Sequence, residues 1–116
     1  MLGKGNMNEI QRQLEMWRQQ KEKRIVYQDK LDLSREVEVF FSFRSKSNAR
    51  KAMSDLSGNG FSVALAFRSL RYEVTGSKNM ALTDEAVVAL ITASVVLAKA
   101  HSGTFDGFAG PVANDV

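Results

Sequence analysis

Apolar positions in the first quarter of the chain recur at steps of three and four, which predicts an amphipathic helix from residue 7 to about residue 24. Its narrow apolar seam consists of Met7, Ile10, Leu14 and Trp17. The seam could dock Trp17 on the rest of the domain, or it could form a helix-in-groove or self-association surface. Docking is favoured because the seam is shorter than the roughly three or four heptads that a free coiled coil needs.

Strict alternation replaces this spacing after a connector at residues 25–36. Val37, Val39, Phe41 and Phe43 share one face, which is typical of a strand with one side against a core. A hairpin connection is expected at residues 68–71 and a loop at residues 76–79. The predicted strands are residues 37–43, 61–67, 71–75 and 105–112.

Two further helices are predicted between these strands. The first begins at a Ser45 or Ser47 cap and ends at Gly58-Asn59-Gly60, because glycine and asparagine tolerate the left-handed conformation at a helix end. The second begins after Thr83, runs to about residue 101 and is apolar over most of its circumference. It must therefore be heavily buried, and Gly103 is expected to stop it.

The resulting order is a helix followed by β-α-β-β-α-β. This order predicts an α+β protein of the ferredoxin-like class, in which two helices cover one face of a four-stranded antiparallel sheet. We expect residues 1–28 to form the N-terminal helix and connector, and residues 29–116 to form the ferredoxin-like domain.

Composition narrows the chemistry that this fold could carry. The 116 residues include no cysteine, which excludes disulfides, iron–sulfur clusters and thiol catalysis. One histidine makes a transition-metal site improbable, so no metal or other cofactor is expected. No secretory leader or membrane-spanning stretch is visible, and a cytoplasmic location is expected. The net charge of +3 is only mildly basic.

Catalysis has few candidates in this sequence. His101 is the one histidine and falls at a helix end, while Asp106 follows five residues later. Asp106 could accept a hydrogen bond from His101 or from turn N–H groups. Neither residue belongs to a recognisable catalytic spacing, so structural roles are favoured and the protein is not expected to be an enzyme.

RNA binding is the alternative that the strand pattern leaves open. On the sheet face away from the helices, Phe40 and Phe108 could offer stacking planes for bases. Cationic side chains lie at or near the strand ends: Arg44, Arg68, Arg71, Arg50 and Lys51. The competing and favoured interpretation is that the N-terminal helix or a second copy of the chain covers these aromatic residues.

Four segments resemble the ribonuclease E inhibitor family, the regulators of ribonuclease E activity B. They are the run Asp29-Lys30 to Arg35 and Val37, the strand VEVFFSF, the helix end LSGNGFSV, and above all the closing run LAKAHSGTFDGF. Together they cover about residues 29–108. The matching positions are Asp29, Lys30, Arg35, Gly60, Phe61, His101, Gly103, Phe105, Asp106, Gly107 and Phe108.

The resemblance implies a non-enzymatic, cytoplasmic protein of ferredoxin-like fold that binds an endoribonuclease and restrains RNA cleavage. The residue types at the matching positions suggest a fold signature. Family members from enterobacteria are strongly acidic, whereas this chain is basic. The contact surfaces expected for a protein partner, for RNA or for a second copy are the N-terminal seam and the open sheet with Phe40, Arg44 and Arg68.

Overall fold

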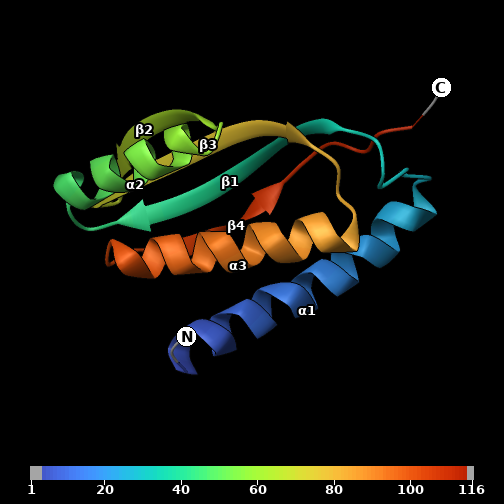
Figure 1. Cartoon of the computed structure of the whole chain (residues 1–116), viewed down its shortest axis with the longest axis horizontal. Coiled ribbons are helices and arrows are strands. Elements are labelled where there is room, and N and C mark those ends of the chain that lie inside the picture. The colour runs from blue at the N-terminus through green and yellow to red at the C-terminus, as the bar shows by residue number, and fades with distance from the viewer. Residues whose placement is uncertain (1–3, 115–116) are drawn as a thin grey trace.

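The computed structural model describes residues 4–114, which form an antiparallel sheet, two helices over it and an additional N-terminal helix (Figure 1). The strand order is β2-β3-β1-β4, and each neighbouring pair is antiparallel. This architecture confirms the predicted α+β, ferredoxin-like class. The elements are α1 (Lys4–Val26), β1 (Arg35–Phe43), α2 (Lys46–Gly58), β2 (Ser62–Arg68), β3 (Arg71–Met80), α3 (Asp84–Ala100) and β4 (Thr104–Ala109).

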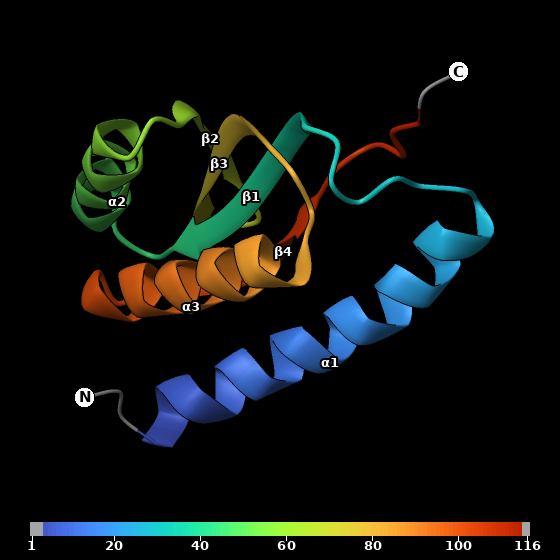
Figure 2. The same ribbon diagram turned by 45° about the vertical axis from the view of Figure 1, so that its right-hand side comes forward.

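The core lies between the sheet and the helices on one of its faces. α2 packs over β1, β2 and β3, while α3 packs against β4 (Figure 2). The alternating residues of β1, Val37 to Phe43, are at most 1% exposed, as expected for the central strand of the sheet. Phe41 also packs against Phe105, with 5.3 Å between the ring centroids. The opposite face of the sheet has no helix over it in the part of the chain that the structure describes.

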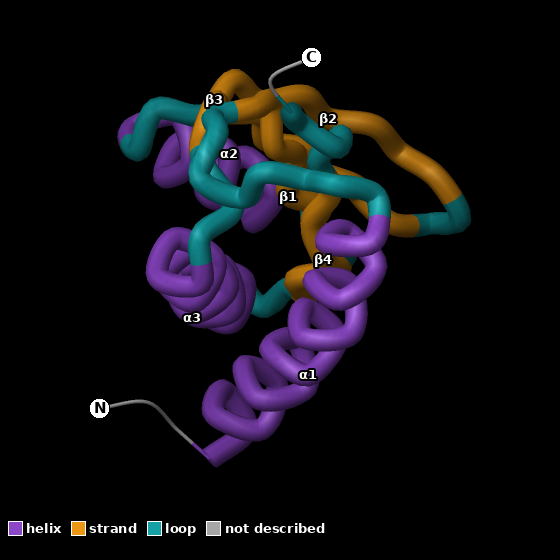
Figure 3. Tube along the Cα trace, turned by 90° about the vertical axis from the view of Figure 1, so that its right-hand side faces the viewer, coloured by secondary structure: helices purple, strands orange, loops and turns teal. Residues whose placement is uncertain are grey.

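α1 docks on the domain through its apolar seam and runs beside α3 and β4 (Figure 3). Ile10 and Trp17 are buried, and the Trp17 ring lies 5.8 Å from that of Phe108. The Trp17 Nε1–H donates to Asp84 Oδ1 at 3.2 Å, so its polar edge is satisfied. Docking therefore accounts for these seam residues, and Met7 alone of the four is largely exposed.

β3 is longer than its sequence predicts, because residues 76–79 continue the strand instead of forming a loop. Gly76 pairs with Val39 on one side and Val63 on the other. A Cβ at Gly76 would come within 3.1 Å of Val39 and 3.3 Å of the Phe61 ring. Glycine thus leaves room for Phe61 over the strand. Pairing with strands on both sides keeps the polar residues 76–79 in the sheet.

A β-bulge in β4 decides which face its aromatic residues occupy. The register shifts between Phe40 and Phe41, and Gly107 has φ = +125°. Phe105 pairs with Phe41 and Phe108 with Val39, so both phenylalanines point to the helix-covered face. The prediction that Phe108 lies on the open face beside Phe40 is wrong, because the extra residue of the bulge reverses the alternation.

Candidate functional site

The most heavily buried polar group of the family pattern is an ion cluster centred on Asp29. The Asp29 side chain is 0% exposed, and that of Arg35 is 2% exposed. Arg35 Nη1 donates to both Asp29 oxygens at 2.6 and 2.7 Å, and Arg24 Nη1 donates to Oδ2 at 2.9 Å. The Ala113 N–H completes the set at 3.2 Å. One carboxylate therefore joins α1, β1 and the segment after β4.

Backbone carbonyls and the Gln20 side chain accept hydrogen bonds from other N–H groups of the two arginines. Arg35 Nη2 donates to the carbonyls of Lys30 and Leu33, and Arg24 Nη2 donates to that of Gly110 at 2.8 Å. Lys30 contributes its main chain to this network, since its N–H also donates to Ala113 at 2.7 Å. Each guanidinium is thus held by several acceptors, as a buried charge requires.

The electrostatics of this cluster keep Asp29 ionised. Burial would raise the pKa of Asp29, but the hydrogen bonds from Arg35, Arg24 and Ala113 outweigh it and lower the pKa below its ordinary value. A carboxylate with every oxygen engaged and no exposed surface is poorly placed to exchange protons with a substrate. The geometry instead fixes the connector between α1 and β1 against the C-terminal segment.

His101 and Asp106 are not brought together. His101 Nε2 lies 2.7 Å from Asp55 Oδ2, which joins the end of α3 to α2. Asp106 lies in the bulge of β4, where burial raises its pKa and a hydrogen bond from Ser42 opposes that shift. Ser42 belongs to the open face of the sheet, whereas His101 ends a helix that covers the other face. The two residues therefore form no catalytic pair.

Gly60 and Gly103, which follow α2 and α3, are needed for different structural reasons. α2 ends as predicted: Gly60 has φ = +89°, and the N–H groups of Gly60 and Phe61 donate to Ser57 and Leu56. α3 ends with the same hydrogen-bond pattern, but Ser102 and not Gly103 takes the left-handed conformation, with φ = +56°.

Gly103 is required for a steric reason instead of a conformational one. A Cβ at Gly103 would lie 2.3 Å from the Phe43 ring and 2.8 Å from the Ser42 carbonyl oxygen. The expectation that Gly103 itself stops α3 is thus corrected. Its missing side chain allows the turn after α3 to pass directly over the end of β1.

The open face of the sheet carries one aromatic side chain, Phe40, among the strand residues that the structure describes. Phe40 is half-buried between Thr75 and Gly107 in the register. Four acidic residues share or border this face: Glu36, Glu38, Glu73 and Asp106. Arg68 is exposed at its end and lies 3.8 Å from Glu73. The face therefore combines little stacking surface with mixed charge.

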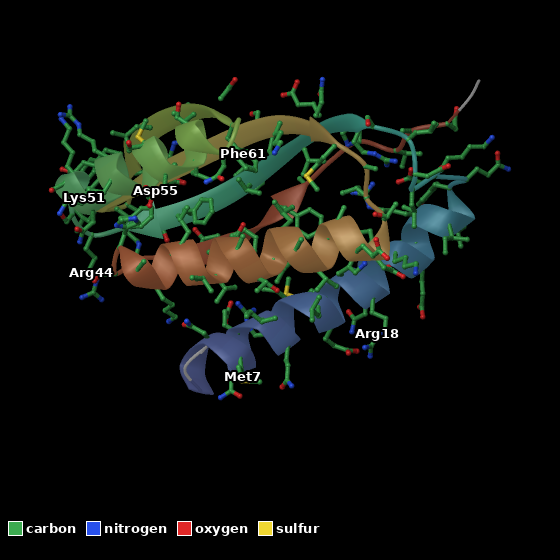
Figure 4. All side chains as sticks on the ribbon, in the orientation of Figure 1. Met7, Arg18, Arg44, Lys51, Asp55 and Phe61 are labelled. Atoms are coloured by element: carbon green, nitrogen blue, oxygen red, sulfur yellow. The ribbon has the colours of Figure 1, made fainter. Side chains whose placement is uncertain are left out.

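Cations gather at the end of the sheet where β1 ends and β2 turns into β3. Arg44 and Lys51 lie at this end in Figure 4. The exposed members are Arg44, Lys46, Arg50, Lys51 and Arg68. The sequence-predicted residues Arg44 and Arg68 thus belong to one end of the molecule, while Met7 and Arg18 lie on α1 (Figure 4).

Three residues that complete these interactions escaped sequence analysis. Arg24 lies in the predicted α1 but outside its apolar seam, and Asp55 and Ser42 are ordinary polar residues of α2 and β1. A weak signal existed for Arg24, since a cation in the last turn of a helix interacts favourably with the helix dipole. Nothing local marks Asp55 as the partner of His101.

Within residues 4–114 no group of three or more His, Cys, Asp or Glu side chains is arranged to hold a metal ion. None of the helices described is long and apolar enough to cross a membrane.

Comparison with known protein families supports the resemblance noted in the sequence. A family model described as RraB, regulator of ribonuclease activity B, matches residues 27–109. No curated protein matches the chain. The matched region begins just after α1 and includes Asp29 and Arg35, the C-terminal ends of α2 and α3, and the whole sheet. Because it covers well over half of the 116 residues, the chain belongs to the RraB family of regulators of ribonuclease activity.

Proposed function

We propose that this protein regulates an endoribonuclease of the ribonuclease E type by binding it, and that it catalyses no reaction of its own. Family membership is the observation that carries the proposal. The roles of the candidate titratable groups agree with it. Asp29 is bound within a buried ion cluster, and His101 joins α3 to α2 through its contact with Asp55. Both groups serve the fold, so regulation acts through the surface.

We further propose that residues 29–116 carry the binding function, and that residues 1–28 add a docked helix. The family match starts at residue 27, which leaves all of α1 outside it. A cytoplasmic location follows from this function, since the proposed target is an enzyme of RNA degradation.

Binding to the enzyme is favoured over binding to its RNA substrate. With Phe108 on the helix-covered face, Phe40 is the remaining aromatic residue of the described open face. The acidic residues on and beside that face, Glu73 and Asp106 among them, would repel phosphates. An RNA-binding sheet needs several stacking planes and a positive field, and this face supplies neither.

The test uses purified full-length protein, the purified host endoribonuclease and a defined RNA substrate. Cleavage should slow saturably as the protein is added, and a complex with the ribonuclease should form in the absence of RNA. The protein alone should leave the RNA intact and should not shift it on a native gel. Unchanged cleavage together with no detectable complex would refute the proposal. Inhibition that requires the protein to bind RNA directly would favour the RNA alternative.

A further inference from the structure

The outer edge of β2 is free in the part of the chain that the structure describes. β2 pairs with β3 alone, through a two-residue turn whose residues Ser69 and Leu70 have φ of +50° and +64°. In such a hairpin the closing residues, Arg68 and Arg71, exchange backbone hydrogen bonds with each other. Every second residue of β2 before Arg68 likewise exchanges hydrogen bonds with its partner in β3. The N–H and C=O groups of the intervening residues Val63, Leu65 and Phe67 therefore point away from β3.

The opposite edge of the sheet is protected in three ways. β4 contains the bulge at Gly107, and Pro111 follows shortly after the strand. α1 lies along it, where Trp17 contacts Phe108. Bulges, proline and a covering helix are the usual devices that keep a sheet edge from pairing with another chain. The sheet therefore has one closed edge and one open edge.

β2 lacks these protective devices. Its sequence SVALAFR has no charge before Arg68, no proline and no bulge. On the helix side, Val63 and Leu65 are only half-buried and Phe67 is 57% exposed, although all three point toward the apolar layer. An additional strand beside β2 would cover these side chains and bind the free backbone groups.

The flank of α2 above this edge is positively charged. Asp55 faces α3, since it contacts His101. At 100° per residue, Lys46 and Arg50 lie on the opposite flank, toward β2 and the edge. Both are exposed. α2 and β2 run in opposite directions, so the beginning of α2, where Lys46 and Arg50 lie, is near the Phe67–Arg68 end of β2.

This charge argues against a second copy of the chain as the occupant. Adjacent strands lie about 4.8 Å apart, so two copies paired through β2 would bring their α2 helices to about 10 Å, which is helix-packing distance. Such a pair is antiparallel, so the two Arg50 side chains would approach each other near its centre, with no acidic residue of α2 on the facing flanks. Like charges would then meet at the interface, which disfavours association.

We propose that the β2 edge binds an extended segment of a partner protein as a fifth strand, and that this segment has apolar residues at alternate positions and acidic residues at one end. The apolar residues cover Val63, Leu65 and Phe67. The acidic end lies beside Arg68 on the open side and beside Arg50 on the helix side. If the proposed function holds, this segment belongs to the ribonuclease.

Amide hydrogen exchange with synthetic peptides tests the edge directly. The probe has three valines at alternate positions, threonines between them and two glutamates at one end; a matched peptide carries lysines instead of the glutamates. At a peptide concentration of about ten times Kd, exchange at Val63, Leu65 and Phe67 should slow about tenfold. The amides of Ala64 and Ala66 already face β3 and should change little.

Charge-reversal variants provide the control on the α2 flank. Arg50→Glu should weaken the acidic peptide about fivefold, as expected for an exposed charge pair, whereas Lys51→Glu on a different side of α2 should leave binding unchanged. No slowing of exchange with the acidic peptide, or equal slowing with the lysine peptide, would overturn the proposal. Protection that rises with protein concentration without peptide would assign the edge to a second copy instead.

The ribonuclease assay separates this inference from the proposed function. Leu65→Pro removes an outward N–H while leaving the bonds to β3, a change that an edge strand tolerates, and circular dichroism checks that the variant folds. Loss of regulation in folded Leu65→Pro and in Arg50→Glu supports both ideas. Regulation that survives in both variants overturns the edge proposal and leaves the function standing. Wild-type protein that binds the peptide but leaves the ribonuclease unaffected refutes the function alone.

Discussion

Removal of the Asp29 carboxylate should be among the most destabilising single changes in this protein. Asp29→Ala leaves the guanidinium of Arg35 buried, with a side chain that is only 2% exposed, and without its counter-charge. Breaking a buried ion pair by deleting one partner costs about 3–5 kcal/mol. Here the carbonyls of Lys30, Leu33 and Pro111 continue to accept from Arg35, so we expect the lower end, about 3 kcal/mol.

Urea unfolding followed by circular dichroism measures this loss. With an m value of about 2 kcal/mol/M, a loss of about 3 kcal/mol lowers the midpoint by about 1.5 M. The matched control is Glu15→Ala, which removes an exposed ion pair with Arg18 and should cost less than about 1 kcal/mol. If Asp29→Ala loses no more stability than Glu15→Ala, the ion cluster does not hold the fold as argued.

The pH dependence gives an independent check on the same carboxylate. The pKa of Asp29 is lowered from 3.8 in the folded state, so its stabilisation is complete above that value and is lost as pH falls through the folded pKa. The stability difference between wild type and Asp29→Asn should therefore stay constant near neutral pH and narrow below about pH 4. A difference that persists unchanged in strong acid would contradict the assignment of the charge.

Three further changes test other parts of the structure. Gly103→Ala should destabilise by about 1–3 kcal/mol, measured by urea unfolding, because the new methyl group overlaps the Phe43 ring; a neutral result would refute the steric argument. Trp17→Ala should lower the free energy of unfolding by about 3 kcal/mol and speed amide exchange throughout α1. Faster exchange at residue 17 and its neighbours alone would mean that other contacts hold the helix. Asp106→Asn should stabilise slightly at neutral pH, because burial raises the pKa of Asp106 and so disfavours its charged form; the gain should vanish as pH falls through that pKa, and a gain independent of pH would point to a different cause.

Local pattern was sufficient for the order and type of the elements. The alternation from Val37 to Phe43 indicates a strand with one buried face, and the apolar circumference of residues 84–100 indicates a buried helix. Each pattern can be read within its own segment, without knowledge of its neighbours in the fold. Thr83 could be identified as a cap for the same reason, since a side chain that accepts from a nearby N–H acts over three residues; of the two candidates Ser45 and Ser47, the structure shows that Ser45 is the cap.

Site residues were recognised as a pattern, but their partners were not. Asp29 and Arg35 belong to the family signature, yet their contact with Arg24 and Ala113 exists only because α1 and the C-terminal segment meet at β1. Asp106, five residues away, was one candidate partner of His101, which instead contacts Asp55, 46 residues away. Proximity in sequence did not predict this contact, because the chain turns from α3 into β4 between His101 and Asp106.

The sequence by itself determined the α+β class, the β-α-β-β-α-β order and the apolar seam of α1, because each depends on periodicity within one segment. Only the tertiary structure decided that β3 continues through Gly76, that a bulge turns Phe108 toward the helices, and that β2 rather than β4 has a free edge. Strand length, register and edge exposure depend on which neighbours each strand acquires. Those neighbours are fixed by long-range packing, which leaves no periodic trace in the chain.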